Sequence, residues 1–127
     1  MALNTKSIYS ESEESDGKRV LVTRFYPRGV KKDRFDVWIR GASPEAKLLK
    51  EYKSGAINWQ EFSKGFRSQM KTSLESKKAV EDIVQMLQDG GNVTLLCYEK
   101  EGEKCHRNLL RKIVDSATKE RRNKEGA

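Results

Sequence analysis

The sequence has few residues that cross-link a chain or interrupt its secondary structure, and it has no long apolar run. Its 127 residues include two cysteines, two prolines and one histidine. Two cysteines are too few for the disulfide framework of a small secreted protein. No segment approaches the roughly 20 apolar residues of a membrane span, and the first residues lack the apolar core of a signal peptide. We therefore expect a cytoplasmic protein that does not enter a membrane.

Charged residues are as frequent as apolar ones. Each class makes up 35% of the chain, which is typical of a soluble domain with a small core. High Lys, Arg and Glu usage with few prolines is compatible with a thermophilic source. The net charge is +7, and positive charge attracts the phosphates of nucleic acids or small metabolites. Because the charge is spread along the chain, solubility explains it more simply than dedicated nucleic-acid binding.

Apolar patterns divide the chain into strands and helices. Continuous apolar runs predict strands buried on both faces at residues 18–24 and 92–98. A shorter run at residues 7–9 predicts an edge strand, and residues 35–39 form either a strand or a helical turn. Helices are predicted from Ser43, as the N-cap before Pro44, from Asn58 with a capping box to Glu61, from Leu74 to the Gly90-Gly91 pair, and from about Lys104.

This order of elements predicts the fold class. A chain of this length forms one domain. Strands without alternation imply a sheet that is covered by other elements. We therefore expect a single three-layer-type α/β domain over residues 1–118, with a small, mostly parallel sheet flanked by helices. Residues 119–127 are expected to form a basic, polar C-terminal tail that continues the last helix and then frays.

The most informative segment lies where the second buried strand leads into the last helix. Cys97 ends that strand, and Cys105, His106 and Arg107 begin the helical pattern. Ligands bind at such junctions in parallel α/β proteins, because strand carboxyl ends meet helix amino ends there. A thiol near a helix amino end and a histidine has a lowered pKa. Cys105 is therefore a candidate nucleophile and His106 a candidate acid or base, with Cys97 and Glu99 in support.

Other interpretations of the same residues remain open. Buried cysteines are often inert packing residues, and a lone histidine is often structural. Cys97 and Cys105 could also form a disulfide across the short loop. Together with His106 they offer three zinc ligands and Glu99 a fourth. We expect no metal, because an adjacent cysteine and histidine rarely reach the same ion.

Three arginines are predicted to converge on this edge of the sheet. Arg24 ends the first buried strand and Arg28 follows it in a Pro-Arg-Gly turn, while Arg107 lies in the first turn of the last helix. If the two strands are parallel neighbours, the three guanidinium groups approach one another, and a phosphate or carboxylate would join them. The alternatives are ion pairs of Arg28 with Asp16 or Asp36, and of Arg107 with Glu99 or Glu103.

Several separated motifs point to one family. They are Asp16-Gly17, the Arg19–Val22 strand, Arg24, Pro27-Arg28-Gly29, Trp38, Trp59 with Phe62, the segment 93–99 and Cys105-His106-Arg107. Matches in separate elements are hard to obtain by chance. In this order, over residues 8 to 116, the chain resembles the short form of domain-of-unknown-function family 488. That form often has Asp where this chain has Thr23. The resemblance implies an α/β fold and a site at the Cys-His-Arg segment, without a reaction.

These observations lead to one functional expectation and two alternatives. We expect an anionic, phosphate-bearing small molecule or nucleotide to bind at the carboxyl edge of the sheet, with cysteine and histidine chemistry acting on it. The alternatives are a nucleic-acid binding or processing protein and a non-catalytic interaction module. The sequence indicates no particular cofactor and no oligomeric state.

Overall fold

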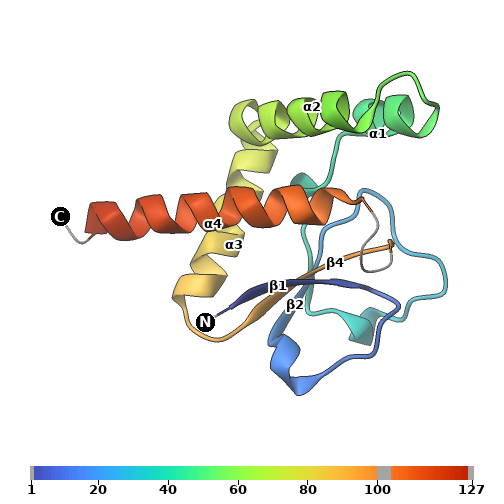
Figure 1. Ribbon diagram of the computed structural model, residues 1–127. Helices are drawn as coiled ribbons and strands as arrows, with labels where there is room; N and C mark the ends of the chain where they lie inside the picture. The colour runs from blue at the N-terminus through green and yellow to red at the C-terminus, as the bar shows by residue number, and fades with distance from the viewer. Residues whose placement is uncertain (1, 100–103, 126–127) are drawn as a thin grey trace.

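Four parallel strands form the sheet on which the chain is built. The computed structural model describes residues 2–99 and 104–125. The strands, in the order β1-β4-β2-β3 across the sheet, all run in the same direction. They are β1 (Leu3–Ser7), β2 (Lys18–Leu21), β3 (Val37–Trp38) and β4 (Val93–Cys97) (Figure 1). The predicted α/β class with a small parallel sheet is therefore confirmed, and β2 and β4 are its central strands.

Four α-helices complete the fold. They are α1 (Ala46–Lys53), α2 (Trp59–Thr72), α3 (Leu74–Gln88) and α4 (His106–Glu125). Asn58 caps α2 as predicted, because its side chain accepts from the Glu61 amide while the Glu61 side chain accepts from the Asn58 amide. Residues 119–125 of the expected tail are the last turns of α4. In the part of the chain that the structure describes, no helix has the length and apolar character needed to cross a lipid bilayer.

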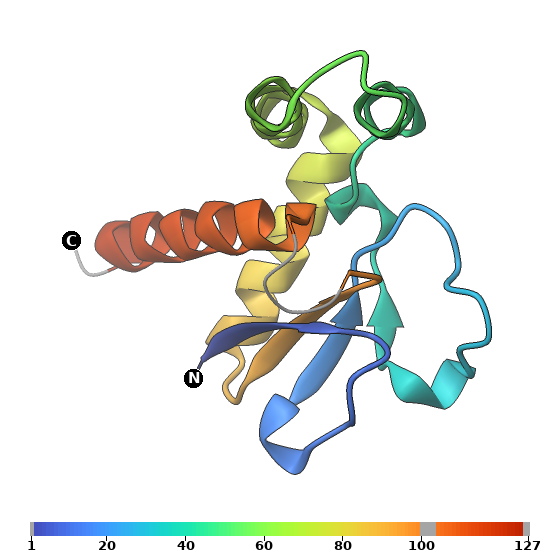
Figure 2. The ribbon, with the colours of Figure 1, turned by 45° about the vertical axis from the view of Figure 1, so that its right-hand side comes forward.

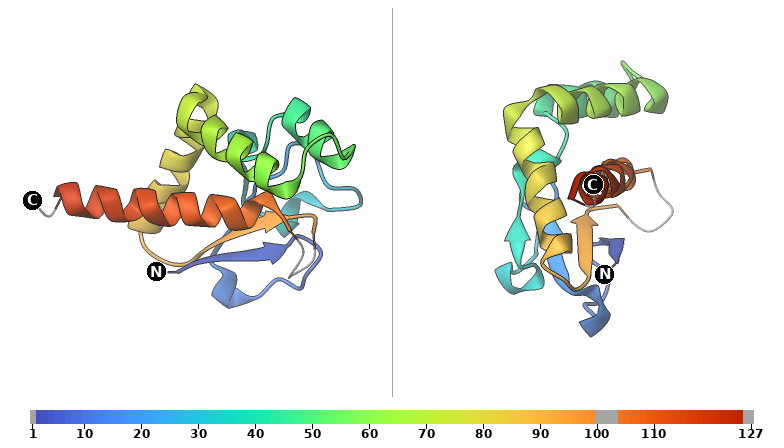
Figure 3. Two further views of the ribbon diagram at one scale, coloured as in Figure 1. Left: turned by 45° about the horizontal axis from the view of Figure 1, so that its top comes forward. Right: turned by 90° about the vertical axis from the view of Figure 1, so that its left-hand side faces the viewer.

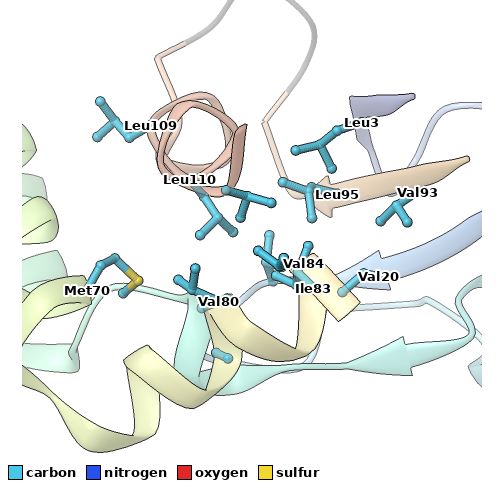
Figure 4. Packing of buried hydrophobic residues seen from close by; sticks show 14 of the residues in the cluster. Leu3, Val20, Met70, Val80, Ile83, Val84, Val93, Leu95, Leu109 and Leu110 are labelled. Carbon is cyan, nitrogen blue, oxygen red and sulfur yellow. The ribbon is translucent and has the colours of Figure 1, made fainter. Parts of the chain in front are cut away.

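The main core lies between the helices and one face of the sheet. Figure 4 shows side chains of α3 and α4 pointing toward those of the strands. The strands contribute Val20 and Leu95, α3 contributes Ile83, α4 contributes Leu110, and α2 adds Phe66. Each of these five side chains is fully buried. Burial of such residues contributes about 1.5–3 kcal/mol each, so this face holds the domain together.

Over residues 2–99 and 104–125, a loop connection and not an α-helix covers the opposite face of the sheet. Leu21 and Leu96 point to this side, where they pack with Val30, Phe35 and Trp38. These last three residues come from β3 and the long connection that precedes it. The alternation of Val20 and Leu21 between the two cores is the period-two pattern of a strand buried on both faces.

Two expected helix details are wrong. Ser43 is not the N-cap of α1, which begins at Ala46 after Glu45. The buried Gln69 side chain donates to the Ser43 carbonyl and accepts from the Glu45 amide, so these tertiary hydrogen bonds hold the segment extended. Leu74 does not belong to the buried face of α3, because it is 82% exposed directly after the Ser73 cap. The buried face begins at Ser76, and its first apolar residue is Ala79.

The strand limits also differ from expectation. The edge strand predicted at residues 7–9 is β1, which lies earlier in the chain and has the polar sequence Leu3-Asn-Thr-Lys-Ser7. Its polar composition does not favour a strand. The pairing with β4 over five residues stabilises the strand instead. Residues 35–39 resolve as a strand at Val37–Trp38, after a 3-10 turn at Lys32–Arg34.

Gly17 allows a close approach that can be tested. Its φ is +64°, and a Cβ there would collide with the backbone oxygen of Asn92, which accepts from the Lys18 amide at 2.9 Å. Gly29 has a similar φ of +75° and no atom within 4 Å of the Cβ position. We expect Gly29→Ala to cost about 1–2 kcal/mol from backbone strain alone. Gly17→Ala should cost about 1–3 kcal/mol more.

Urea unfolding of both variants measures the difference. Equal losses in the free energy of unfolding would show that the contact with Asn92 relaxes without penalty.

Candidate functional site

The carboxyl ends of β2 and β4 meet the amino end of α4 at one edge of the sheet. Figure 2 shows the ends of both strands beside the start of the helix. β2 and β4 are hydrogen-bonded parallel neighbours, with Leu21 opposite Leu96. Cys97 is the last residue of β4, Cys105 directly precedes α4 and His106 is its first residue. The strand adjacency on which the predicted site depends is therefore present.

The two cysteines form a buried sulfur pair. Their Sγ atoms are 2.8 Å apart and share a hydrogen bond, and both thiols are free. Cys97 is 1% exposed and Cys105 is 3% exposed. The Cys97 thiol also lies 3.0 Å from Oε2 of Glu99. The thiol proton of Cys97 therefore has two acceptors within reach, the Cys105 sulfur and the Glu99 carboxylate.

His106 is oriented toward both sulfurs. Its Nδ1 lies 3.7 Å from the Sγ of Cys97 and 3.7 Å from the Sγ of Cys105. Its Nε2 lies 2.5 Å from the Val22 carbonyl. A carbonyl only accepts, so Nε2 carries a proton and Nδ1 is the atom that exchanges one with the sulfurs. The ring is also packed against Phe66, with centroids 5.6 Å apart.

The surroundings shift the pKa values of the two thiols in opposite directions. The hydrogen bond from Cys97, followed by the hydrogen bond and charge of His106, lowers the pKa of Cys105 to about 6 in spite of its burial. Burial, followed by the contact with Cys105, raises the pKa of Cys97. Burial also opposes ionisation of Glu99, but hydrogen bonds from the two cysteines lower the pKa of its carboxyl overall. The two pKa shifts run in opposite directions, so Cys105 is the more acidic thiol of the pair and Cys97 the less acidic one.

A pocket of about 350 Å³ opens onto this cluster. Cys97, Glu99 and His106 form part of its wall, and Arg24 and Lys53 supply two cations. Arg24 donates from Nε to the Pro44 carbonyl and from one terminal nitrogen to the Ser43 carbonyl. The remaining lining residues are Thr23, Phe25, Pro44, Leu49 and Tyr98.

The three predicted arginines do not line this pocket together. Arg24 lines it, whereas Arg28 is exposed in the connection after β2. Arg107 is 1% exposed and donates to the Glu99 carbonyl at 2.6 Å. It lies on the buried stripe of α4 with Leu110 and Val114. The spacing of three and four residues along that stripe is the signal that could have placed Arg107 inward.

Asp16 lies at the opposite end of the sheet. It precedes β2, where it pairs with Lys6 at 3.0 Å and with Arg19. The Glu13 amide also donates to its carboxylate. Burial raises the pKa of Asp16, but these hydrogen bonds and charges outweigh it and lower the pKa overall. Asp16 therefore holds the amino end of β2 and does not reach the cysteine pair.

Lys53 and Tyr98 reach the site without having been predicted from the sequence. Lys53 is the last residue of α1 and lies among many other lysines in the sequence, so nothing in its local pattern sets it apart. Tyr98 follows Cys97, and its hydroxyl donates to the Phe25 carbonyl. That contact joins the ends of β4 and β2 at the pocket wall.

The donor atoms of the cluster are close enough to be compared with a metal site. The sulfurs of Cys97 and Cys105 and a ring nitrogen of His106 lie within 4.8 Å of one another. Tetrahedral zinc with two thiolates separates their sulfurs by about 3.8 Å. The sulfurs here lie 2.8 Å apart and would have to move apart to share an ion. The arrangement fits a hydrogen-bonded thiol pair better.

Comparison with known families gives a match over almost the whole described chain. The family model DUF488-N3a, described as "Active DUF488-N3 subclade", matches residues 3–118. The matched region contains every strand, the first three helices and the cysteine–histidine cluster.

Individual relatives are similar over shorter stretches. The chain is 29% identical to "Uncharacterized protein YeaO" of Escherichia coli over 87 residues, which cover 67% of this chain and 76% of that protein. It is 29% identical to "Uncharacterized protein Rv3073c" of Mycobacterium tuberculosis over 68 residues, which cover 52% of this chain and 58% of that protein. No solved structure matches the chain.

The different pKa values of the two thiols predict the result of a titration. Ultraviolet thiolate absorbance should show one ionisation near pH 6, because the pKa of Cys105 is lowered to about 6. Removing the hydrogen bond from Cys97 with Cys97→Ala should move this step to higher pH, and His106→Ala should move it upward by a smaller amount. Cys105→Ala should abolish it. A step near pH 6 that survives Cys105→Ala would assign the thiolate to another group.

Proposed function

Because this chain belongs to the DUF488-N3 family, in the subclade described as active, we propose that it binds an anionic, phosphate-bearing small molecule or nucleotide and acts on it with Cys105 and His106. The observation that carries the proposal is the pocket of about 350 Å³, whose wall contains two cations and opens onto the buried sulfur pair.

Arg24 and Lys53 are the groups that would hold the anion. Both line the pocket, and Glu99 is the carboxylate that accompanies them. That carboxylate is already engaged by the Cys97 thiol. The other terminal nitrogen of Arg24 and the Lys53 ammonium can face a ligand, because Arg24 uses only Nε and one terminal nitrogen on backbone carbonyls. Planar guanidinium and mobile ammonium groups suit phosphate oxygens.

The sulfur pair would supply the nucleophile. In the proposed step a thiolate attacks an electrophilic atom of the bound molecule, and the bond to the leaving group breaks with its electron pair. The leaving group takes a proton from Nδ1 of His106, which had received it from the thiol. A water molecule, deprotonated by the same nitrogen, then releases the product and restores the thiolate. The hydrogen bond to Val22 keeps the ring in place through both proton transfers.

Access to the pocket distinguishes the two sulfurs. Cys97 lines the pocket, whereas Cys105 lies behind it at 2.8 Å. The shared hydrogen bond allows a proton to pass from Cys97 to Cys105. The negative charge then lies on Cys97, the sulfur nearer the pocket. In this proposal Cys105 and His106 generate the negative charge, and the Cys97 sulfur delivers it to the bound molecule as the attacking thiolate.

Competition between two alkylating reagents tests recognition and reactivity together. Iodoacetate is anionic and iodoacetamide is neutral, while both modify thiolates. Relative to free cysteine, the protein should favour iodoacetate, because Arg24 and Lys53 attract it. Lys53→Ala should reduce that preference several-fold. Lys47→Ala is the matched control, since Lys47 is exposed on the same helix and lines none of the cavities described here.

Peptide mapping by mass spectrometry identifies the modified sulfur, and inorganic phosphate should slow its modification by iodoacetate. The proposal fails if the protein shows the reagent preference of free cysteine, or if Lys47→Ala and Lys53→Ala change it equally.

A further inference from the structure

A second recess lies on a different part of the surface, between α2 and α4. The two helices contact each other and lie close together in the left view of Figure 3. A groove of about 740 Å³ lies between them, and a recess of about 630 Å³ lies between α3 and the later turns of α4. Arg67, Lys71 and Lys112 line both, so the two form one continuous surface. No residue of this groove lines the cysteine pocket.

Positive charge is concentrated along this groove. Lys64, Arg67 and Lys71 repeat at helical spacing on one face of α2, and Lys112 faces them from α4. Lys77 extends the series along α3. Among the residues that the structure describes, none of these five cations makes an ion pair or a side-chain hydrogen bond. The larger section is lined by no carboxylate, whereas Glu81 and Glu120 line the other.

Five neighbouring cations without internal partners repel one another, and a bound anion would relieve that repulsion. The length of the row constrains the anion. Lys64 and Lys71 are separated by two turns of α2, or about 10.5 Å along its axis. A single phosphate group cannot contact both ends of this row, so the groove suits an extended polyanion.

The groove also offers an aromatic surface. Trp59 lines its larger section and stacks on Phe62, with centroids 5.2 Å apart and planes at 20°. Tyr52 packs against the same indole at 5.6 Å. An indole fixed in this way beside a row of cations is the combination that binds unpaired bases together with their phosphates. An acidic peptide would use the cations and leave the indole without a role.

From these observations we propose that the groove between α2 and α4 binds single-stranded nucleic acid. The row of cations tracks the phosphate backbone, and Trp59 stacks a base at its end. A single strand can present an unstacked base to Trp59, whereas a duplex keeps its bases stacked. This activity is separate from the chemistry proposed for the cysteine pair.

Fluorescence anisotropy with a labelled oligothymidylate provides the test. We expect binding that weakens with salt, with a slope of about −0.7 per phosphate contact on a double logarithmic plot. The variant Lys64→Gln, Arg67→Gln, Lys71→Gln should bind at least about ten-fold more weakly at low salt, and its slope should be smaller by about 2. These side chains are exposed, so we expect the variant to fold, and its thermal unfolding confirms that.

The matched control removes the same amount of charge elsewhere. Lys18→Gln, Lys31→Gln, Lys119→Gln changes three exposed cations that line none of the cavities described here. It should retain most of the affinity and the slope. Equal losses in both triple variants would reduce the effect to net charge and overturn the proposal. Tighter binding of a duplex of the same length, equal competition by polyglutamate, or no binding at low salt would each also overturn it.

Discussion

The parallel pairing of β2 with β4 is the constraint from which the rest of the site follows. It places the carboxyl ends of two strands, 75 residues apart in sequence at Leu21 and Leu96, side by side at one edge of the sheet. The Val22 amide then donates to the Leu96 carbonyl at 3.0 Å, which extends the ladder to the pocket. Without this register, Arg24 would not reach the same wall as Cys97.

His106 converts that strand pairing into a defined chemical environment. One ring nitrogen is bound by the Val22 carbonyl, directly after β2, and the other faces a sulfur at the end of β4 and a sulfur directly before α4. The ends of three elements thus contact a single imidazole ring. A fixed ring needs little rearrangement before it exchanges a proton, which is the condition for efficient general acid–base chemistry.

The sequence allowed the fold class and the proximity of Cys97, Cys105 and His106 to be predicted, because these depend on strand order and on the polarity of helices. It did not allow the direction of single side chains to be predicted. Arg107 points inward because it shares the buried stripe of α4. Lys53 lines the pocket from the end of α1, and the segment before that helix is held by the buried Gln69 amide. Long-range hydrogen bonds of this kind leave no local pattern.

Helices cover one face of the sheet and a loop connection covers the other, so substitutions on the two faces have different consequences. Substitutions on the helical side, around Phe66 and Ile83, alter the main core. The connection that covers the other side also carries Phe25, whose exposed ring lines the pocket. Insertions or replacements in that connection can therefore reshape the mouth of the pocket while the helical core stays intact. The shape of the pocket can therefore change without a change in the fold that supports it.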